Sequence, residues 1–470
     1  MVASAVALKS GYRQNAQPKV RYAELPQEGV KWCAVTLSDV LSAKKRLEAT
    51  VFDLRGKYAR EVIADCRWES VPLPQLTTDA YYPGRFKRIY CEAFEGEPFY
   101  LPSQLTEIYP KPDKYISAQT KCDISELRLK LGDILLTRSG TIGSVTIVSK
   151  TLENAVYSDD VIRVTPKKDD VGFLYAYLRS DIGNTILQTN QYGSVIQHIE
   201  PEHLSNIPVP IPSEHIKRRI NDLVLRSFDL RDESNTMIDC AAAMLINALE
   251  LPPLHKLRTE KFEGSADVDN FSVKLSNLAG RLDGSYHVPI VSAITEHLRA
   301  HAAEVTTVGD QRVSMDIILP GRFKRVYVEK GQGQVFFSGK NITELDPSDK
   351  KYLSFSQHNK RIKEQLTIRR NMILVTCSGT VGRIALVPEH WDNWTMTHDI
   401  IRLVSTSEMQ GYLYIWLQSE YAYKLIEAMA YGSVVPHIEV LHMEKIPVPI
   451  LKDAGAQAEI NRLALQAPSQ

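Results

Sequence analysis

The strongest constraint on how this chain can fold is a six-residue string, P-G-R-F-K-R, that occurs twice. The two copies span residues 83–88 and 320–325. Each copy is followed by an aliphatic residue and then a tyrosine, and these two tyrosines, Tyr90 and Tyr327, are 237 positions apart. If the string belongs to a duplicated domain, other segments should recur at nearly the same distance.

Further segments do recur, in the same order and at an offset of 239. S-G-T-x-G, Y-G-S-V and I-P-V-P-I begin at Ser139, Tyr192 and Ile207, and again at Ser378, Tyr431 and Ile446. Because the offset drifts so little, we interpret the chain as a tandem duplication of one domain. The predicted organisation is an N-terminal arm (1–34), a first domain (35–212), a spacer helix (213–251), a linker (252–270), a second domain (271–451) and a short C-terminal helix (452–470).

Short apolar runs alternate with turns inside each predicted domain. The runs expected to form strands are residues 133–137, 145–148 and 161–164, matched by 372–376, 383–387 and 400–403. The first two of each set flank a glycine turn and should form a hairpin. Helical segments are predicted at 173–191 and 412–430. This mixture favours an α+β fold, and the I-P-V-P-I segments fit only an edge or a linker because proline cannot donate ladder hydrogen bonds.

The segment between the two predicted domains has the spacing of a long helix. Over residues 213–251, apolar or small residues alternate at intervals of four and three, which is a heptad seam, and Pro252 and Pro253 stop it. At ~1.5 Å per residue this helix is roughly 55 Å long. We therefore expect a coiled-coil spacer; the alternative is an amphipathic helix packed on its own domain. The seam positions are Ile216, Ile220, Leu223, Ser227, Leu230, Ser234, Met237, Ala241, Met244, Ala248 and Leu251.

Composition excludes several classes of protein. Hydrophobic residues make up 44% and charged residues 24%, an ordinary balance for a soluble globular protein. No apolar run approaches the ~20 residues that span a bilayer, and residues 1–11 lack a signal-peptide core, so we expect a cytoplasmic protein. The six cysteines are scattered, which argues against a zinc site or a disulfide framework. With 56 basic and 56 acidic residues, net charge does not decide whether nucleic acid is a partner.

The repeated string supplies the best candidates for contacts with DNA phosphates. Three cations within four residues make a local positive edge that can neutralise phosphates and position a domain. The alternative is a solvated charged turn, but identical recurrence in a sequence that has diverged elsewhere favours DNA. The candidates are Arg85, Lys87, Arg88, Arg322, Lys324 and Arg325.

The S-G-T-x-G turns and Y-G-S-V loops provide the other candidate contacts. Arg138 stands where the second copy has Cys377, and Gln197 where it has Pro436, so the two copies differ at these matched positions. Glutamine can pair with adenine through two hydrogen bonds. His198 and the equivalent His437 are expected to make structural hydrogen bonds rather than to bind metal. The candidates are Arg138, Ser139, Thr141, Tyr192, Ser194, Gln197, Ser378, Thr380, Tyr431 and Ser433.

Together, the repeats, their proline-containing exits and the intervening heptad helix resemble the DNA-specificity subunit of type I restriction-modification systems. The S-G-T-I-G turn, the Y-G-S-V-I-Q-H-I element and the I-P-V-P-I exit carry the resemblance, which covers residues 35–467. It implies two target-recognition domains in a pseudo-two-fold arrangement, held apart by an antiparallel coiled coil. One departure is the C-terminal helix, which is shorter than the family pattern, so that a partner or a second copy could supply helix to the exposed seam.

The resemblance also implies a division of labour. This subunit recognises double-stranded DNA and binds no cofactor, whereas a partner adenine-N6 methyltransferase subunit holds S-adenosylmethionine, and a restriction and translocation subunit can join. The sequence agrees, because it contains no adenine-methyltransferase motif, P-loop or nucleophile elbow. We therefore expect a non-catalytic phage-defence subunit that binds a bipartite, asymmetric target and directs adenine methylation and restriction. The alternatives are a stand-alone DNA-binding or defence-complex scaffold without a methyltransferase partner, and a chain with nuclease activity of its own.

Overall fold

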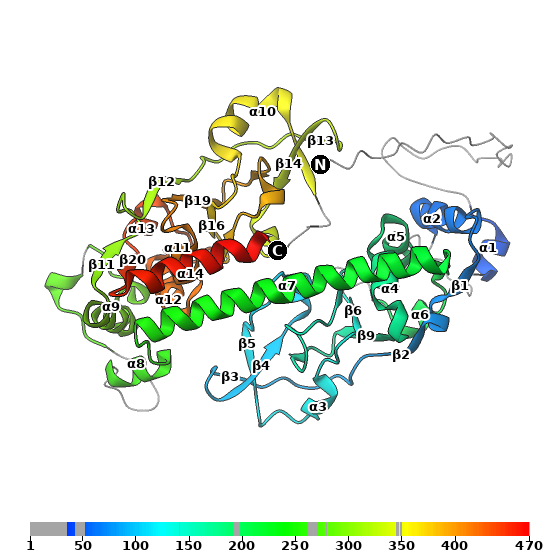
Figure 1. Cartoon of the computed structure of the whole chain (residues 1–470), viewed down its shortest axis with the longest axis horizontal. Helices are drawn as coiled ribbons and strands as arrows, with labels where there is room; N and C mark the ends of the chain where they lie inside the picture. Colours follow the sequence, from blue (N-terminus) through cyan, green and yellow to red (C-terminus); the bar gives the residue numbers. More distant parts are fainter. Residues whose placement is uncertain are drawn as a thin grey trace.

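The computed structural model describes residues 35–42, 52–140, 142–190, 198–261, 271–278, 280–344, 347 and 350–469. In this part of the chain a long helix, α7 (Glu214–Ala248), lies between two regions that each contain helices and strands (Figure 1). The expected mixed helix and strand content is confirmed. The predicted N-terminal arm lies outside the described residues. Within them, no helix has both the length and the apolar character needed to cross a membrane.

The first region precedes α7 and alternates short helices with short strands. Its elements are α1 (Leu37–Ser42), α2 (Leu54–Ala64), β1 (Ser70–Pro72), β2 (Thr77–Tyr81), β3 (Tyr90–Cys91), β4 (Gly96–Tyr100), β5 (Lys114–Ser117), α3 (Ile124–Leu127), β6 (Ile134–Thr137), β7 (Val145–Ile147), β8 (Val156–Tyr157), β9 (Val161–Pro166), α4 (Val171–Arg179), α5 (Asp181–Thr189), α6 (Pro201–Leu204) and β10 (Pro208–Pro210).

The second region follows α7 and α8 (Leu254–Lys261), a helix inside the predicted linker. Its elements are α9 (Pro289–His301), β11 (Glu304–Thr307), β12 (Ser314–Ile318), β13 (Tyr327–Val328), β14 (Gly333–Phe337), β15 (Lys351–Ser354), α10 (Phe355–Arg361), β16 (Ile373–Thr376), β17 (Ile384–Leu386), β18 (Thr395–Met396), β19 (Ile400–Ser405), α11 (Gln410–Gln418), α12 (Glu420–Met429), α13 (Val440–Met443), β20 (Pro447–Ile450) and α14 (Ala454–Gln466).

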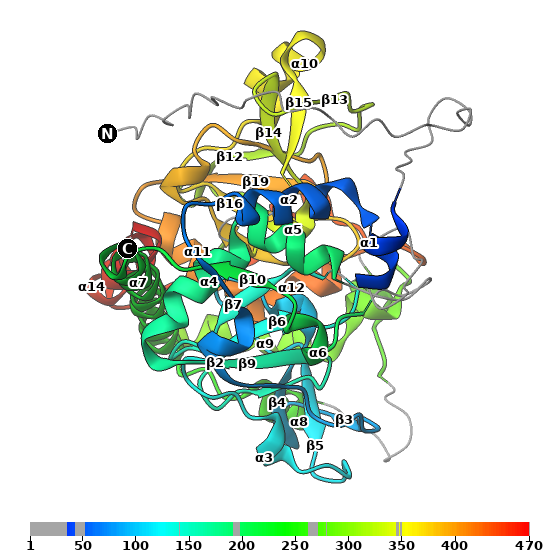
Figure 2. The same cartoon turned by 90° about the vertical axis from the view of Figure 1, so that its right-hand side faces the viewer.

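The described strands of the two regions are connected in the same way. The large sheets have the orders β2-β9-β6-β7 and β12-β19-β16-β17, and the small sheets β3-β5-β4-β8 and β13-β15-β14-β18. A two-stranded pair accompanies each, β1 with β10 and β11 with β20. The pairs β4–β8 and β14–β18 are parallel, and the large sheets are antiparallel. The two small sheets lie at opposite edges of the molecule, with α10 beside one and α3 beside the other (Figures 1 and 2).

The predicted strands and hairpins are confirmed. β6 and β7 pair with Leu135 opposite Thr146, and β16 and β17 pair with Leu374 opposite Ala385. The central strands are fully buried, as expected of short apolar runs. The I-P-V-P-I segments form strands of the two-stranded pairs, where a proline does not interrupt a larger hydrogen-bonded ladder.

The predicted helical segments are each divided in two. α4 ends and α5 begins at Ser180, and α11 and α12 meet in the same way at Ser419. Both serines have extended backbone angles, and each side chain accepts a hydrogen bond from the N–H of Gly183 or Ala422 in the following helix. A serine cap of this kind starts a new helix, so one continuous helix was the wrong prediction.

The helix α7 contributes to the core of both regions. In the first half of the helix, Phe228 is buried in the first-region core, where its ring meets that of Tyr175 on α4 edge to face. Near its end, Ile238 and Leu245 join the second-region core, and this part of the core also contains Ile460 of α14. α7 and α14 pack against each other, as Figures 1 and 2 show. The long helix therefore connects two cores.

The predicted heptad seam coincides with the buried face of α7 only in part, at Ala241. Leu223 is 64% exposed, and Ser227 and Ala248 are also exposed. The buried positions include polar residues, which bond to neighbouring segments and which a search for apolar periodicity passes over. The alternative left open by the sequence, a helix packed on its own domain, does not describe α7 either, because its residues join the cores of both regions. The buried residues of α7 are Asn221, Phe228, Asp232, Asn235, Ile238, Ala241 and Leu245.

Two glycines allow close helix crossings at equivalent places. The Gly172 N–H donates to Asn221 Oδ1 at 2.8 Å where α4 meets α7, and the Gly411 N–H donates to Asn461 Oδ1 at 2.7 Å where α11 meets α14. A Cβ added to Gly172 would lie 2.5 Å from the Asn221 backbone oxygen, and one on Gly411 would lie 2.3 Å from that of Asn461. No real side chain fits at such distances without moving backbone.

We expect Gly172→Ala and Gly411→Ala each to lower the free energy of unfolding by about 1–3 kcal/mol, because the added methyl group must push two helices apart. Urea unfolding measures the effect. Gly84→Ala is the matched control, since an added Cβ there meets no atom within 4 Å. If all three variants were equally stable, close contact at these crossings would not require glycine.

The two regions also touch beside the middle of α7. The Ile108 N–H donates to the Thr343 backbone oxygen at 2.8 Å, and the Glu107 carboxylate accepts from Arg383 Nη1 at 3.3 Å. Arg231 of α7 donates to the Ile108 backbone oxygen at 2.6 Å and so holds this loop in place. Burial raises the pKa of Glu107 to about 7, against the opposing effect of Arg383.

This raised pKa predicts a pH-dependent contribution to stability. The folded chain binds the Glu107 proton more tightly than the unfolded chain, so the contribution is fully present below the ordinary value of 4.5 and is lost as pH rises through about 7. We expect Glu107→Gln to remove about 2–3 kcal/mol of the stability difference between acidic and mildly alkaline pH. Urea unfolding of both proteins at each pH checks this. Identical pH dependence in variant and wild type would contradict it.

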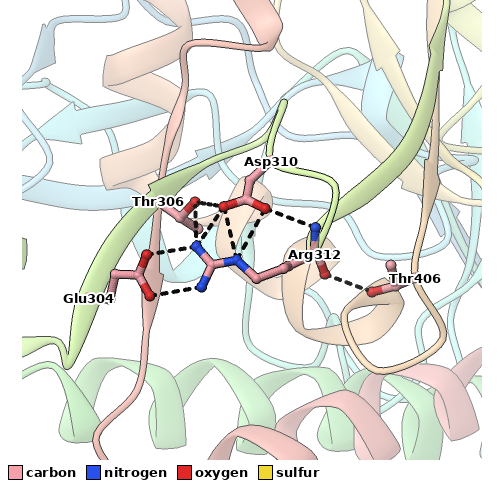
Figure 3. A network of polar contacts seen from close by, with 5 residues as sticks. All are labelled: Glu304, Thr306, Asp310, Arg312 and Thr406. Carbon is pink, nitrogen blue, oxygen red and sulfur yellow. Dashed lines mark hydrogen bonds and ion pairs between the residues drawn. The ribbon is translucent and has the colours of Figure 1, made fainter.

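A network of polar contacts around Arg312 positions the start of the second region (Figure 3). Arg312 Nη2 lies 2.7 Å from Glu304 Oε1 on β11 and 2.6 Å from Asp310 Oδ2, and the Thr406 hydroxyl donates to the Arg312 backbone oxygen at 3.0 Å. Hydrogen bonds from this guanidinium hold the pKa of Asp310 well below its usual range. Because Arg312 and Glu304 are exposed, solvent screens their pairing, and we assign the network a local positioning role.

A buried arginine joins the large sheet to the small sheet in each region. Arg163 on β9 and Arg402 on β19 are both 0% exposed. Arg402 donates to the backbone oxygens of Ile400 at 2.7 Å and of Met396, on small-sheet strand β18, at 2.8 Å. Arg163 donates to that of Tyr157, on small-sheet strand β8, at 3.2 Å. Each guanidinium thus satisfies carbonyl groups where the two sheets meet.

Candidate nucleic-acid interface

The two P-G-R-F-K-R strings form the loops that enter the small sheets, from β2 to β3 and from β12 to β13. The phenylalanine of each string anchors its loop. Phe86 meets Phe99 of β4 edge to face with ring centroids 6.5 Å apart, and Phe323 meets Phe336 of β14 at the same distance. The equal geometry places the flanking cations at the same edge of each small sheet.

The cations of the string divide into two kinds. Arg88 is partly buried and donates to Asp159 Oδ1 at 2.5 Å and to the Ser158 hydroxyl at 3.1 Å. Arg325 occupies the same place, with Thr397 Oγ1 at 3.0 Å and Asp399 Oδ2 at 3.6 Å. These two guanidinium groups are already engaged within the chain, so we now assign them a positioning role. The remaining candidates of the string are exposed: Arg85, Lys87, Arg322 and Lys324.

In the second region, the S-G-T-x-G turn and the Y-G-S-V loop lie together. The Gly379 N–H donates to the Pro436 backbone oxygen at 3.1 Å, and Ser378 forms an isolated β-bridge with His437. Tyr431 and His437 close the loop through two backbone hydrogen bonds, at 2.9 and 2.7 Å. The sequence-predicted residues Thr380, Tyr431 and Ser433 are exposed on this surface, and Ser378 is partly buried.

Tyr431 is fixed by its own loop. Its hydroxyl donates to Glu439 Oε1 at 2.5 Å, and this bond is the main reason why the pKa of Tyr431 is raised. Val434, at the tip of the loop, is 90% exposed. The surface thus presents an apolar tip beside hydroxyl groups, a combination that suits contact with a nucleic-acid groove.

The equivalent surface of the first region is described only in part. Arg138 is 6% exposed, and its guanidinium lies 2.6 Å from Glu200 Oε1 and 3.2 Å from Asp160 Oδ1. A DNA contact by Arg138 would require both ion pairs to break, because the guanidinium is buried and engaged by both carboxylates. The Ser139 hydroxyl bonds to Asp160, and Ser139 forms a β-bridge with His198. The candidates Thr141, Tyr192, Ser194 and Gln197 lie outside the described residues.

Sequence reasoning missed the two residue pairs that hold the arginines at these surfaces. Asp159 and Asp160 hold the two arginines of the first region, and His398 and Asp399 face Arg325 at the equivalent position. The offset of 239 aligns the two pairs and could have identified them. His398 replaces an aspartate, and burial lowers its pKa despite the opposing charge of Asp399.

A further basic residue was also missed in the second region. Arg361, at the end of α10, donates to the Gly321 backbone oxygen at 2.8 Å, and its guanidinium lies 5.0 Å from the centre of the Phe323 ring. It adds positive charge beside the exposed Arg322 and Lys324. No cluster of three or more His, Cys, Asp or Glu side chains suited to a metal ion occurs among the described residues.

Residues 86–236, about a third of the chain, match the family model of the type I restriction modification DNA specificity domain. The matched residues lie in the first region and the start of α7, and the match confirms the resemblance found in the sequence. No curated protein sequence matches the chain.

Two solved structures are similar to the chain at low identity. The type I restriction-modification S subunit from M. genitalium is 14% identical, with a TM-score of 0.27 over 86% of this chain and 90% of that one. The HsdS subunit from Thermoanaerobacter tengcongensis is also 14% identical, with a TM-score of 0.26 over 86% of this chain and 90% of that one.

Proposed function

We propose that this chain is the DNA sequence-recognition subunit of a type I restriction-modification complex. The two regions are tandem target-recognition domains, with the boundaries 35–212 and 271–451 given above, and the spacer at 213–251 separates them. The observation that carries the proposal is the repetition of one strand order in both regions, each presenting the same pair of exposed cations from the same loop. The family model of the DNA specificity domain matches residues of the first region.

The target is bipartite and asymmetric. α7 contains 35 residues, so at ~1.5 Å per residue it is about 50 Å long. That length exceeds one turn of DNA, which is about 34 Å. The two small sheets also lie at opposite edges of the molecule. Each region therefore contacts its own half-site, and the two half-sites are separated along the duplex. The regions also differ beneath the loop cations, where Arg88 meets Asp159 in one and Arg325 meets His398 in the other. Different surfaces read different half-sites.

The chemistry belongs to partner subunits. This chain binds double-stranded DNA and brings an adenine-N6 methyltransferase subunit, which carries S-adenosylmethionine, to the target; a restriction and translocation subunit acts on the same complex. The chain itself is not an enzyme. Its cytoplasmic location follows from this role.

Co-expression of the chain with each adenine-N6 methyltransferase found in the same genome tests the proposal. We expect the two proteins to copurify and to methylate adenine in genomic DNA only when both are present. Copurification without methylation, or DNA binding by a chain that recruits no methyltransferase, would favour the stand-alone scaffold instead. Cleavage of DNA by the purified chain with Mg²⁺ would contradict a non-catalytic subunit.

A further inference from the structure

A tyrosine–lysine pair stands at the same exposed place on each small sheet. Tyr90 begins β3 and Tyr327 begins β13, and they are 42% and 43% exposed. Lys114, at the start of β5, places its Nζ 5.8 Å from the centre of the Tyr90 ring, and Lys351, at the start of β15, places its Nζ 5.4 Å from that of Tyr327. Both lysines are exposed.

The inner face of each tyrosine ring is fixed by the core. The Tyr90 ring lies 6.2 Å from that of Phe99, and the Tyr327 ring lies 6.0 Å from that of Phe336. The same phenylalanines anchor the P-G-R-F-K-R loops, so the pair and the loop share one rigid support. The tyrosine is therefore presented at a set distance from the loop cations instead of moving freely on the surface.

Packing does not explain why the outer part of the pair recurs. The phenolic rings and the lysines are open to solvent, and an exposed cation–π contact contributes only ~0.5–1 kcal/mol. Other residues of the same strands differ between the regions, since Cys91 and Ile116 in one correspond to Val328 and Leu353 in the other. A fixed hydroxyl beside a cation is, however, a suitable donor set for a DNA phosphate.

We propose that Tyr90 with Lys114, and Tyr327 with Lys351, form a second DNA-backbone contact in each recognition domain, next to the one made by the loop cations. Each lysine neutralises one phosphate, and each tyrosine hydroxyl donates a hydrogen bond to the phosphate or sugar alongside it. These contacts set the position of the small sheet on the duplex and are independent of base sequence. The inference rests on the proposed DNA-binding function.

Salt titration of DNA binding tests the inference with the full-length chain and a fluorescent duplex of random sequence, because phosphate contacts need no target site. Each neutralised phosphate contributes about 0.9 to the slope of log affinity against log salt. We expect Lys114→Gln and Lys351→Gln each to reduce the slope by about 0.9 and the affinity at ~0.1 M salt about eightfold, and the double variant to reduce the slope by about 1.8. Tyr90→Phe and Tyr327→Phe should weaken binding severalfold at unchanged slope.

Lys168→Gln is the matched control, since Lys168 is an exposed lysine beside α4 and away from the small sheet. The inference would be overturned if Lys114→Gln and Lys351→Gln had the same salt slope as Lys168→Gln. The proposed function would remain intact in that case. If the wild-type chain bound no DNA even at low salt, the proposed function would fall first and this inference with it.

Discussion

Replacing Arg402 with methionine should lower the free energy of unfolding of the second region by about 3 kcal/mol. Methionine fills similar space but leaves the backbone oxygens of Ile400 and Met396 without this donor, and an unsatisfied buried acceptor costs about 1–3 kcal/mol. Burial lowers the pKa of Arg402 to about 10, so removing the charge recovers part of the loss. The cost of leaving two buried carbonyl groups without a donor exceeds the gain from no longer burying a charge. The net effect on the free energy of unfolding is therefore destabilising.

Urea unfolding and protease digestion measure this effect. Since Arg402 joins the small sheet to the large one, limited proteolysis should cleave the small sheet of the variant first. Arg370→Met is the matched control, because Arg370 is exposed and pairs only with Glu389 at the surface, where the expected change is within about 0.5 kcal/mol. Equal stability of the Arg402 and Arg370 variants would contradict the assigned role.

Neutralising the four exposed cations of the repeated strings should weaken DNA binding on the order of 10³-fold at ~0.1 M salt, with a loss of about 3.6 in the salt slope. The reason is that, under the proposed function, each exposed cation accounts for one phosphate contact, and each of the two regions loses two. Salt titration on a random-sequence duplex provides the measurement. The variant replaces Arg85, Lys87, Arg322 and Lys324 with glutamine.

The engaged arginines of the same strings supply the contrasting experiment. Arg88 and Arg325 face Asp159 and Asp399 inside the chain. Arg88→Gln and Arg325→Gln should therefore reduce stability and leave the salt slope nearly unchanged. The assignment of DNA-contacting and positioning cations would be contradicted if the quadruple variant kept the wild-type salt slope. It would also be contradicted if Arg88→Gln and Arg325→Gln lowered that slope.

Much of the fold could be predicted because one offset of about 239 residues relates two copies of the same pattern. The buried strands β6 and β16 are short apolar runs, and their hairpin turns contain glycines at fixed places, so sequence and structure agree there. The small sheets could not be predicted in the same way. β3 and β8 contain two residues each, too few to show an alternation of polar and apolar side chains.

The buried face of α7 was mispredicted for a different reason. Asp232 is buried because it accepts hydrogen bonds from the Ser149 hydroxyl at 2.7 Å and the Lys150 N–H at 2.9 Å, on a turn more than 80 positions earlier in the chain. Asn221 is buried because it caps the start of α4 at Gly172. Apolar periodicity carries no information about such partners, and the predicted seam was displaced as a result.

The candidate DNA contacts stay a prediction, and the structure adds which of their side chains are already engaged. The sequence analysis treated the cations of the repeated string and Arg138 alike, as candidate contacts. Arg138 and Arg88 are held by Asp160 and Asp159, which are separated from them by 22 and 71 positions. Only the folded arrangement shows which positive charges remain available for phosphates.

Methylome sequencing of a host with and without this chain, alongside its methyltransferase, tests the central claim most directly. A subunit with two different recognition domains set apart by α7 should add one methylated motif with two specified parts, unequal in sequence and separated by unspecified bases. An unchanged methylation pattern, or a single uninterrupted motif, would contradict the account.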